Sequence, residues 1–121
     1  MIRIFALALL AVVWTSAACA ADKDDARVAI AQAQAAVQAA ENADAATAAS
    51  TEMRAAKDNL TAAHGASDRR QWDDSILNAQ KATADANLAS ARARQQRATS
   101  ATKEIEASLE SLRQQATPTG S

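Results

Sequence analysis

The chain is poor in the residues that build disulfides, metal sites and aromatic cores. Its 121 residues include one cysteine, one histidine and no tyrosine, and aromatic residues make up 2% of the sequence. A single cysteine cannot form a disulfide framework within one chain. A single histidine leaves a zinc site or a hydrolytic triad without its usual companions. We therefore predict no catalytic, cofactor-binding or metal-binding residues.

An excess of one charge is lacking as well. The chain carries 13 basic and 14 acidic residues, and this balance argues against a dedicated nucleic-acid binder. The one basic cluster, Arg92, Arg94 and Arg97, lies on different faces of a helix and has no aromatic neighbour on which bases could stack. We interpret the cluster as a solvated surface.

The N-terminal segment has the pattern of a secretory signal peptide. Arg3 supplies a positive start, an apolar run follows over residues 4–13, and small residues surround Ala20 and Ala21. This order of charge, apolar run and small-residue cleavage site is typical of exported proteins. The run is shorter than the roughly 20 residues that a spanning helix needs. We predict a signal peptide over residues 1–20, with cleavage between Ala20 and Ala21.

A second processing route is open at Cys19. Ala17 and Ala18 fit the small residues of a bacterial lipoprotein box, whereas Ser16 stands where a branched aliphatic residue is usual. Lipid on Cys19 would anchor the protein at a membrane, since each buried CH₂ contributes about 0.8 kcal/mol. We expect a periplasmic protein, with an outer-membrane lipoprotein as the alternative.

Helix-forming residues fill the rest of the chain. Alanine accounts for about three residues in ten, and between Asp22 and Gln115 there is no proline and a single glycine. Alanine, glutamine, lysine, arginine and glutamate all favour helices. The sequence predicts an all-α domain over residues 21–116, built as an antiparallel alanine-rich bundle, and a flexible tail over residues 117–121.

Two interruptions divide this helical stretch. Gly65 stands where a helix end favours a left-handed residue, and Ser67 and Asp68 are candidate caps of the next helix. An earlier break is indicated before Ser50, the candidate cap there, because the apolar stripes on its two sides are out of phase by two residues. We predict three helices with a long third. One continuous first helix would instead give a two-helix coiled-coil hairpin.

The last predicted helix carries an apolar heptad. Its members are Leu77, Ala84, Ala91, Ala98, Ile105 and Leu112, with Leu88 and Leu109 four residues after two of them. A second stripe on a neighbouring face includes Trp72, Ile76, Ala79, Thr83 and Ala86. Two stripes on one helix predict two neighbours. We interpret Leu88, Ile105, Leu109 and Leu112 as a partner-facing seam, and Trp72 as the residue that anchors the turn end of the bundle.

Polar residues near the turn have structural interpretations. His64, beside Gly65, is expected at a helix end, where the helix dipole favours a cation. Asp73 and Asp74 would point about 100° apart on a helix, so they would not converge on one ion. Carboxylates near a helix start are stabilised by its dipole.

Several short motifs are shared with one family of bacterial envelope proteins. They are Ala29-Ile30-Ala31-Gln32-Ala33, Glu41-Asn42-Ala43, Met53-Arg54-Ala55-Ala56-Lys57-Asp58-Asn59-Leu60, Asp68-Arg69-Arg70-Gln71-Trp72-Asp73-Asp74-Ser75, Asn78-Ala79-Gln80-Lys81-Ala82 and Ala86-Asn87-Leu88-Ala89. On these motifs residues 26–115 resemble the family catalogued as domain of unknown function 4398, whose members tend to have proline at Ser50 and tyrosine at Trp72. The resemblance implies secretion or lipid anchoring, sometimes beside peptidoglycan-binding outer-membrane modules, and it implies no activity.

These features favour a non-enzymatic helical protein of the cell envelope. We expect a structural or protein-interaction module that binds protein partners, or itself, through its helices, and that needs no cofactor. The alternative is a soluble periplasmic chaperone-like or binding protein.

Overall fold

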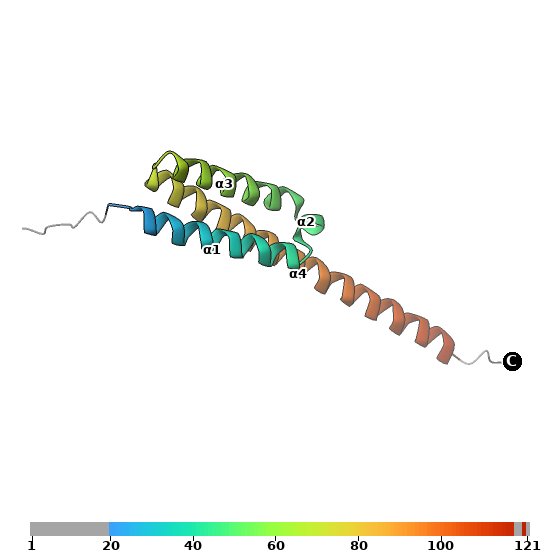
Figure 1. Cartoon of the computed structure of the whole chain (residues 1–121). Coiled ribbons are helices and arrows are strands. Elements are labelled where there is room, and N and C mark those ends of the chain that lie inside the picture. Colours follow the sequence, from blue (N-terminus) through green and yellow to red (C-terminus); the bar gives the residue numbers. More distant parts are fainter. Residues whose placement is uncertain (1–19, 118–119, 121) are drawn as a thin grey trace, which may run out of the picture.

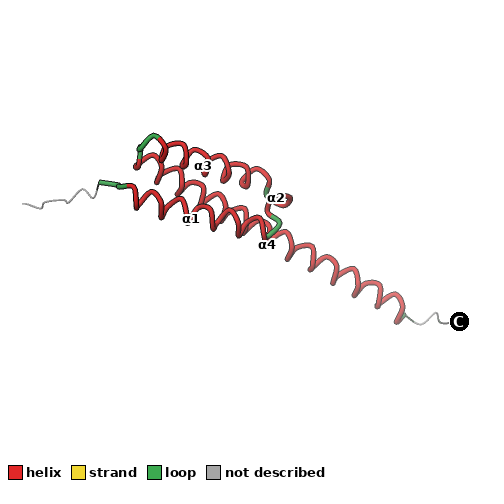
Figure 2. Tube along the Cα trace, in the orientation of Figure 1, coloured by secondary structure: helices red, strands yellow, loops and turns green. Residues whose placement is uncertain are grey.

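The computed structural model describes residues 20–117 and 120, which form helices joined by short turns (Figure 1 and Figure 2). The helices are α1 (Lys23–Asn42), α2 (Ala45–Ala48), α3 (Ser50–Asp68) and α4 (Trp72–Ala116). No strand occurs in these residues. The all-α prediction is confirmed.

The three long helices lie side by side over the first half of α4 (Figure 1). α1 and α4 run in the same direction, and α3 runs opposite to both. α4 packs closely against each of the other two and then continues beyond them. The prediction of three helices with a long third is confirmed, with the short α2 in addition, and the two-helix hairpin is wrong.

Alanine fills most of the core. α1 buries the stripe that begins at Ile30 and α3 buries Met53 and Ala56, as expected, while Leu60 is partly buried. The other apolar residues buried in the described chain are alanines, apart from Val37. Small side chains let the helix backbones approach closely, but they bury little apolar area, at about 25 cal/mol per Å². The core of the bundle is therefore thin.

Two turns separate α1 from α3. Asp44 forms the first in the left-handed conformation, with φ of 58°, which aspartate tolerates better than most residues. Ala49 forms the second, immediately after α2. The predicted break is confirmed, but the prediction that Ser50 caps α3 is wrong. Ser50 is already the first helical residue, Ala49 precedes it, and no side chain caps this end.

α3 ends at Asp68 in a Schellman motif. The amide of Arg70 donates to the carbonyl of Ser67 at 2.9 Å, and the amide of Gln71 donates to the carbonyl of Ala66 at 2.9 Å. Arg70 has φ of 58° and fills the left-handed position that glycine usually occupies in this motif.

The prediction that this helix ends at Gly65 is wrong. α3 passes through Gly65 because its buried face continues beyond it, with Ala66 only 1% exposed. Ser67 and Asp68 therefore belong to the end of α3, and α4 begins at Trp72. Packing of the alanine face outweighs the weak helix propensity of one glycine, which costs about 1 kcal/mol relative to alanine.

The buried face of α4 is not the heptad that begins at Leu77. It consists of Ser75, Ala79, Ala82, Ala86, Ala89, Ser90 and Ala93. Apart from Ser90 these are spaced alternately by four and three residues, so they form a heptad of their own, and Ala79 and Ala86 come from the second predicted stripe. The predicted heptad is offset by two residues, or about 200° around the helix. It therefore lies on the far side of α4 from α1 and α3.

Both predicted terminal segments extend outside the described residues. The signal peptide over residues 1–20, apart from Ala20, and the lipidation site Cys19 lie outside them. Ala20 and Ala21 precede α1, and Thr117 follows α4 in an extended conformation. Among the described helices, none is both long and apolar enough to cross a membrane.

Candidate protein-interaction surface

The second half of α4 is a single helix that leaves the bundle. We call its residues 94–116 the arm. Figure 1 shows the arm extending past the ends of α1 and α3, and every residue in it is exposed. At 1.5 Å per residue the arm is roughly 34 Å long. Most helical stability in proteins comes from tertiary packing, so a partner that packs against the arm would stabilise it.

Two arginines fix the start of the arm to the bundle. Nη2 of Arg97 donates to the carbonyl of Ala43 at the end of α1, at 2.7 Å. Arg92, in the last buried turn of α4, pairs with Glu52 of α3. These contacts hold the ends of α1 and α3 against α4 where the arm begins. Two of the three arginines of the predicted basic cluster, Arg92 and Arg97, therefore bind groups of the protein itself.

Five large aliphatic side chains follow one line along the outside of α4. We call this line, which runs at heptad spacing from Leu77 to Leu112, the outer stripe. Its large members are Leu77, Leu88, Ile105, Leu109 and Leu112. Their side chains are 45–60% exposed. Ala84, Ala91, Ala98 and Thr102 lie between them at heptad spacing, together with the polar Lys81 and Gln95. The outer stripe contains all four residues of the predicted partner-facing seam, and the structure leaves all four accessible to a partner.

Charged residues border the outer stripe on one side. Asp85, Arg92, Glu106 and Arg113 each directly follow a heptad member of the stripe, and we call them the flanking charges. Arg92, Glu106 and Arg113 are exposed, and Oδ2 of the partly buried Asp85 accepts a hydrogen bond from Asn59 at 2.8 Å. In helical pairs, charges at such positions determine orientation and partner choice.

The remaining predicted residues do not gather into a site. His64 lies within α3 rather than at its end, and the side-chain amide of Gln34 donates to its Nε2 at 3.2 Å. Trp72 is the first residue of α4 and is partly buried. It is not a member of either core cluster. Asp73 and Asp74 lie in the first turn of α4, where the helix dipole favours them.

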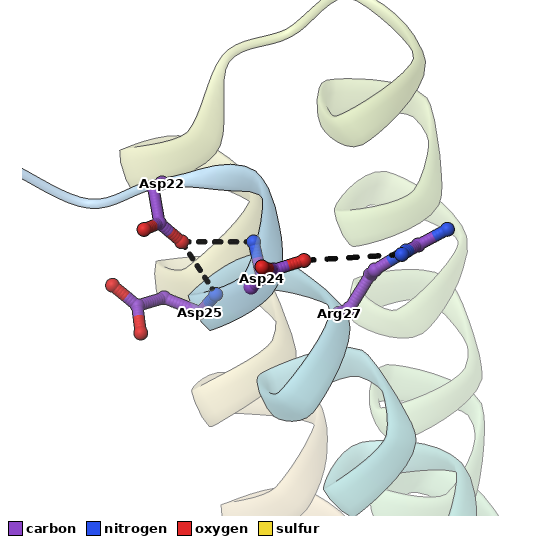
Figure 3. Close-up of polar contacts among 4 residues, drawn as sticks. All are labelled: Asp22, Asp24, Asp25 and Arg27. Atoms are coloured by element: carbon purple, nitrogen blue, oxygen red, sulfur yellow. Dashed lines mark hydrogen bonds and ion pairs between the residues drawn. The ribbon is translucent and has the colours of Figure 1, made fainter.

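Sequence reasoning missed a cap close to the predicted cleavage site. Oδ1 of Asp22 accepts hydrogen bonds from the amides of Asp24 at 2.8 Å and Asp25 at 2.9 Å (Figure 3). Arg27 then pairs with Asp24 at 3.8 Å. The signal was present, since an aspartate followed by acidic residues is typical of a helix start. After cleavage at Ala20, Asp22 would be the second residue of the mature chain and would still cap α1.

The pockets and the metal-binding side chains of the described residues do not indicate a further site. A shallow hollow of about 220 Å³ lies where α2 meets the base of the arm, with Thr47, Ala48, Gln96 and Arg97 among its lining residues. Within residues 20–117, no group of three or more histidine, cysteine, aspartate or glutamate side chains could hold a metal ion. The outer stripe with its flanking charges runs along the exposed side of α4 from Leu77 to Arg113. Such a surface suits contact with another helix.

Comparisons with known proteins give one match. A family model described as Domain of unknown function (DUF4398) matches residues 28–105. This range covers α1 from Val28 onward, α2, α3 and α4 as far as Ile105. Neither the comparison with curated proteins nor that with solved structures gave a match. Because the family model spans more than half of the sequence, the chain belongs to the DUF4398 family.

Proposed function

We propose that this protein is a non-enzymatic interaction module of the bacterial cell envelope, in which the bundle holds the arm of α4 out to bind another helical protein. The observation that carries this proposal is the arm itself. It leaves the bundle with every residue exposed and presents Ile105, Leu109 and Leu112 along one face. Contact between two such faces removes apolar surface from water, which is the main driving force of helical association.

The division of α4 into two opposite faces supports this role. Over the bundle, α4 uses a heptad of alanine and serine to bind α1 and α3. The outer stripe is not needed for that packing, since Leu77 and Leu88 stay half exposed. A helix with two apolar faces at heptad spacing has two sets of neighbours, and only one set belongs to the bundle.

The proposed location is the periplasm, reached through the signal peptide over residues 1–20. Anchoring at the outer membrane through Cys19 is the alternative. The intact mass of the protein recovered from envelope fractions distinguishes the two. A chain that starts at Ala21 without an adduct supports the free periplasmic form, and a chain that starts at Cys19 with acyl groups supports the anchored form. An unprocessed chain would contradict export.

Cross-linking in living cells tests the role of the arm. We compare the natural protein with Ile105→Asp/Leu109→Asp, which places two charges in the outer stripe. The matched control, Ala107→Asp/Ser111→Asp, places the same two charges four residues apart on the opposite side of the arm. We expect the stripe variant to lose the cross-linked species that the natural protein and the control both form. Equal cross-linking in all three, or in none, would contradict the proposal.

A chaperone-like binding protein is the second candidate. The half exposure of five large aliphatic side chains favours it, because apolar clients could bind there. The same cross-linking experiment separates the candidates. A dedicated interaction module gives one or two defined products, whereas a chaperone gives many products that increase after heat stress and include unfolded clients. The five aliphatic side chains lie along one heptad line rather than around a cavity, and this arrangement favours the interaction module.

A further inference from the structure

We propose that the outer stripe binds a second copy of this chain, through an antiparallel pairing of the two α4 helices in which Ala91 of one copy faces Leu109 of the other. This inference rests on the proposed function and names the partner. It follows from the pairs of aliphatic side chains that this register forms and from the signs of the flanking charges.

This register brings aliphatic side chains of the two copies together toward each end of the pairing. In an antiparallel coiled coil each core residue faces one core residue of the second helix, and residue numbers rise along one helix while they fall along the other. The pairs are Leu112 with Leu88, Leu109 with Ala91, Ile105 with Gln95, Thr102 with Ala98 and Ala116 with Ala84, and each pair occurs twice by symmetry. Leu109 of each arm therefore meets the small Ala91 of the other copy, Leu112 meets Leu88, and Ile105 lies against the longer, polar Gln95. The first two pairs remove aliphatic surface from water.

Charges select this register over its neighbours. Arg92 of one copy faces Glu106 of the other, and Asp85 faces Arg113, so all flanking charges meet the opposite sign. A shift of one heptad in one direction brings Arg92 against Arg113. A shift in the other direction brings Asp85 against Glu106. Like charges placed together in a helical interface disfavour that pairing, so both neighbouring registers are penalised.

A parallel pairing would bring the large side chains of the stripe together in like pairs, but it lacks the pairs of opposite charge. It would place Lys81 of each copy against Lys81 of the other inside the seam. The flanking charges would face the uncharged side chains of Gln80, Asn87, Ala101 and Ser108. In the antiparallel register Lys81 instead lies beyond the end of the second copy's helix at Ala116, where its charge stays in water. The sequence of the stripe therefore favours opposite directions.

The bundle leaves room for the second copy. α1 and α3 pack on the buried face of α4, and the arm of the second copy would lie on the opposite face, over Leu88 and Ala91. Arg92 already pairs with Glu52, but its side chain is 54% exposed, and a guanidinium has five donor hydrogens. Asp85 uses Oδ2 to accept from Asn59, and its other oxygen can accept from Arg113 of the second copy.

Site-specific disulfides test the pairing directly. The full chain is prepared with Cys19→Ser, which removes its only cysteine, and two further variants add Ala91→Cys or Leu109→Cys. Oxidation of the 1:1 mixture should give a covalent dimer that contains one copy of each variant, whereas each variant alone should stay uncrosslinked. In the proposed register, two copies of residue 109 are about 27 Å apart along the coil, which is too far for a disulfide.

Each other outcome overturns the proposal. Cross-linking of the Leu109→Cys variant with itself would show a parallel pairing. A dimer in sedimentation equilibrium without a disulfide in any mixture would show another interface or register. A monomer at every concentration would exclude the second copy as partner. In that last case, cross-linking of the stripe to a different protein in cells would leave the proposed function intact, so the two failures are distinguishable.

A charge reversal gives a second, independent readout. Glu106→Arg places two arginines together at both ends of the pairing, and we expect it to weaken the dimer about tenfold. Glu104→Arg changes the net charge equally but lies away from the stripe, so it should leave the dissociation constant within about twofold. Equal effects of the two variants in sedimentation equilibrium would contradict the proposed contact of Glu106 with Arg92.

Discussion

Alanine determines how closely the helices of this protein approach one another. Ala56 of α3 and Ala82 and Ala89 of α4 are fully buried, and no larger side chain could enter these positions without separating the backbones. Among the described residues, the one fully buried polar side chain is Ser75, whose hydroxyl donates to the carbonyl of Ala63 at 2.8 Å. Its hydrogen bond ties α4 to α3 where an alanine would provide only contact.

We predict that Ala82→Leu destabilises the bundle by about 1–3 kcal/mol, because extra methylenes must be forced into a packed core. The matched change, Ala84→Leu, adds the same atoms two residues away on the outer stripe. It should leave the stability of the monomer within about 0.5 kcal/mol. Urea unfolding followed by circular dichroism at low protein concentration measures both. Equal destabilisation by the two variants would contradict the assignment of the two faces.

At Gly65, in contrast to Ala82, a larger side chain should stabilise the bundle. It lies inside α3 without a positive φ, and a methyl group there would meet only the end of the Arg69 side chain, at 3.4 Å. Gly65→Ala should therefore stabilise the protein by about 0.5–1 kcal/mol, since glycine costs backbone entropy in a helix. Thermal unfolding gives the measurement. A loss of stability would mean that the helix does end at Gly65, as the sequence pattern indicated.

The element that distinguishes this molecule from a simple three-helix bundle is the arm. Every residue of the arm is exposed, although Arg97 donates to the carbonyl of Ala43 at the end of α1. We predict that a chain ending after Thr99 keeps the stability of the natural monomer within about 0.5 kcal/mol. The same truncation should abolish association. Unfolding and sedimentation of the shortened chain check the two statements separately, and a bundle that fails to fold without the arm would contradict the division of α4.

Heptad spacing in the sequence predicted the length of α4 but not which face is buried. Two heptads offset by two residues run along it, and the one with Leu77 and Leu88 contains the larger side chains. Side-chain area alone would place that heptad in the core of the bundle. The structure buries the series with Ala79 and Ala86 because α1 and α3 are also alanine-rich along their contact faces, and small faces pack against small faces at short distance.

The position of a turn could be predicted from the sequence only where the local residue types and the packing of the helices indicate the same position. The break before α3 was predictable because the stripes at Ile30 and Met53 are out of phase. The end of α3 was not, because its left-handed residue is Arg70 and the only glycine nearby, Gly65, lies inside the helix. No local pattern marks an arginine for that conformation. The candidate partner surface was predictable in its residues, since large aliphatic side chains at heptad spacing are visible in the sequence.

For the whole molecule, the thin core and the exposed arm make association and stability depend on each other. A ligand that binds only the folded state stabilises it, and a tenfold rise in free partner well above the dissociation constant adds about 1.4 kcal/mol. We predict that the midpoint of thermal unfolding rises with protein concentration. In Ile105→Asp/Leu109→Asp it should become independent of concentration. A natural protein whose midpoint ignores concentration would contradict self-association.

One measurement tests most directly whether the outer stripe is the contact surface of this protein. A photoreactive amino acid is placed at each position from 98 to 112, and the variants are illuminated in living cells. We expect the yield of cross-linked product to rise and fall with the heptad, with maxima at Ala98, Thr102, Ile105, Leu109 and Leu112. A flat profile, or maxima on the opposite side at Ser100 and Ala107, would show that the arm does not use this stripe to bind its partner.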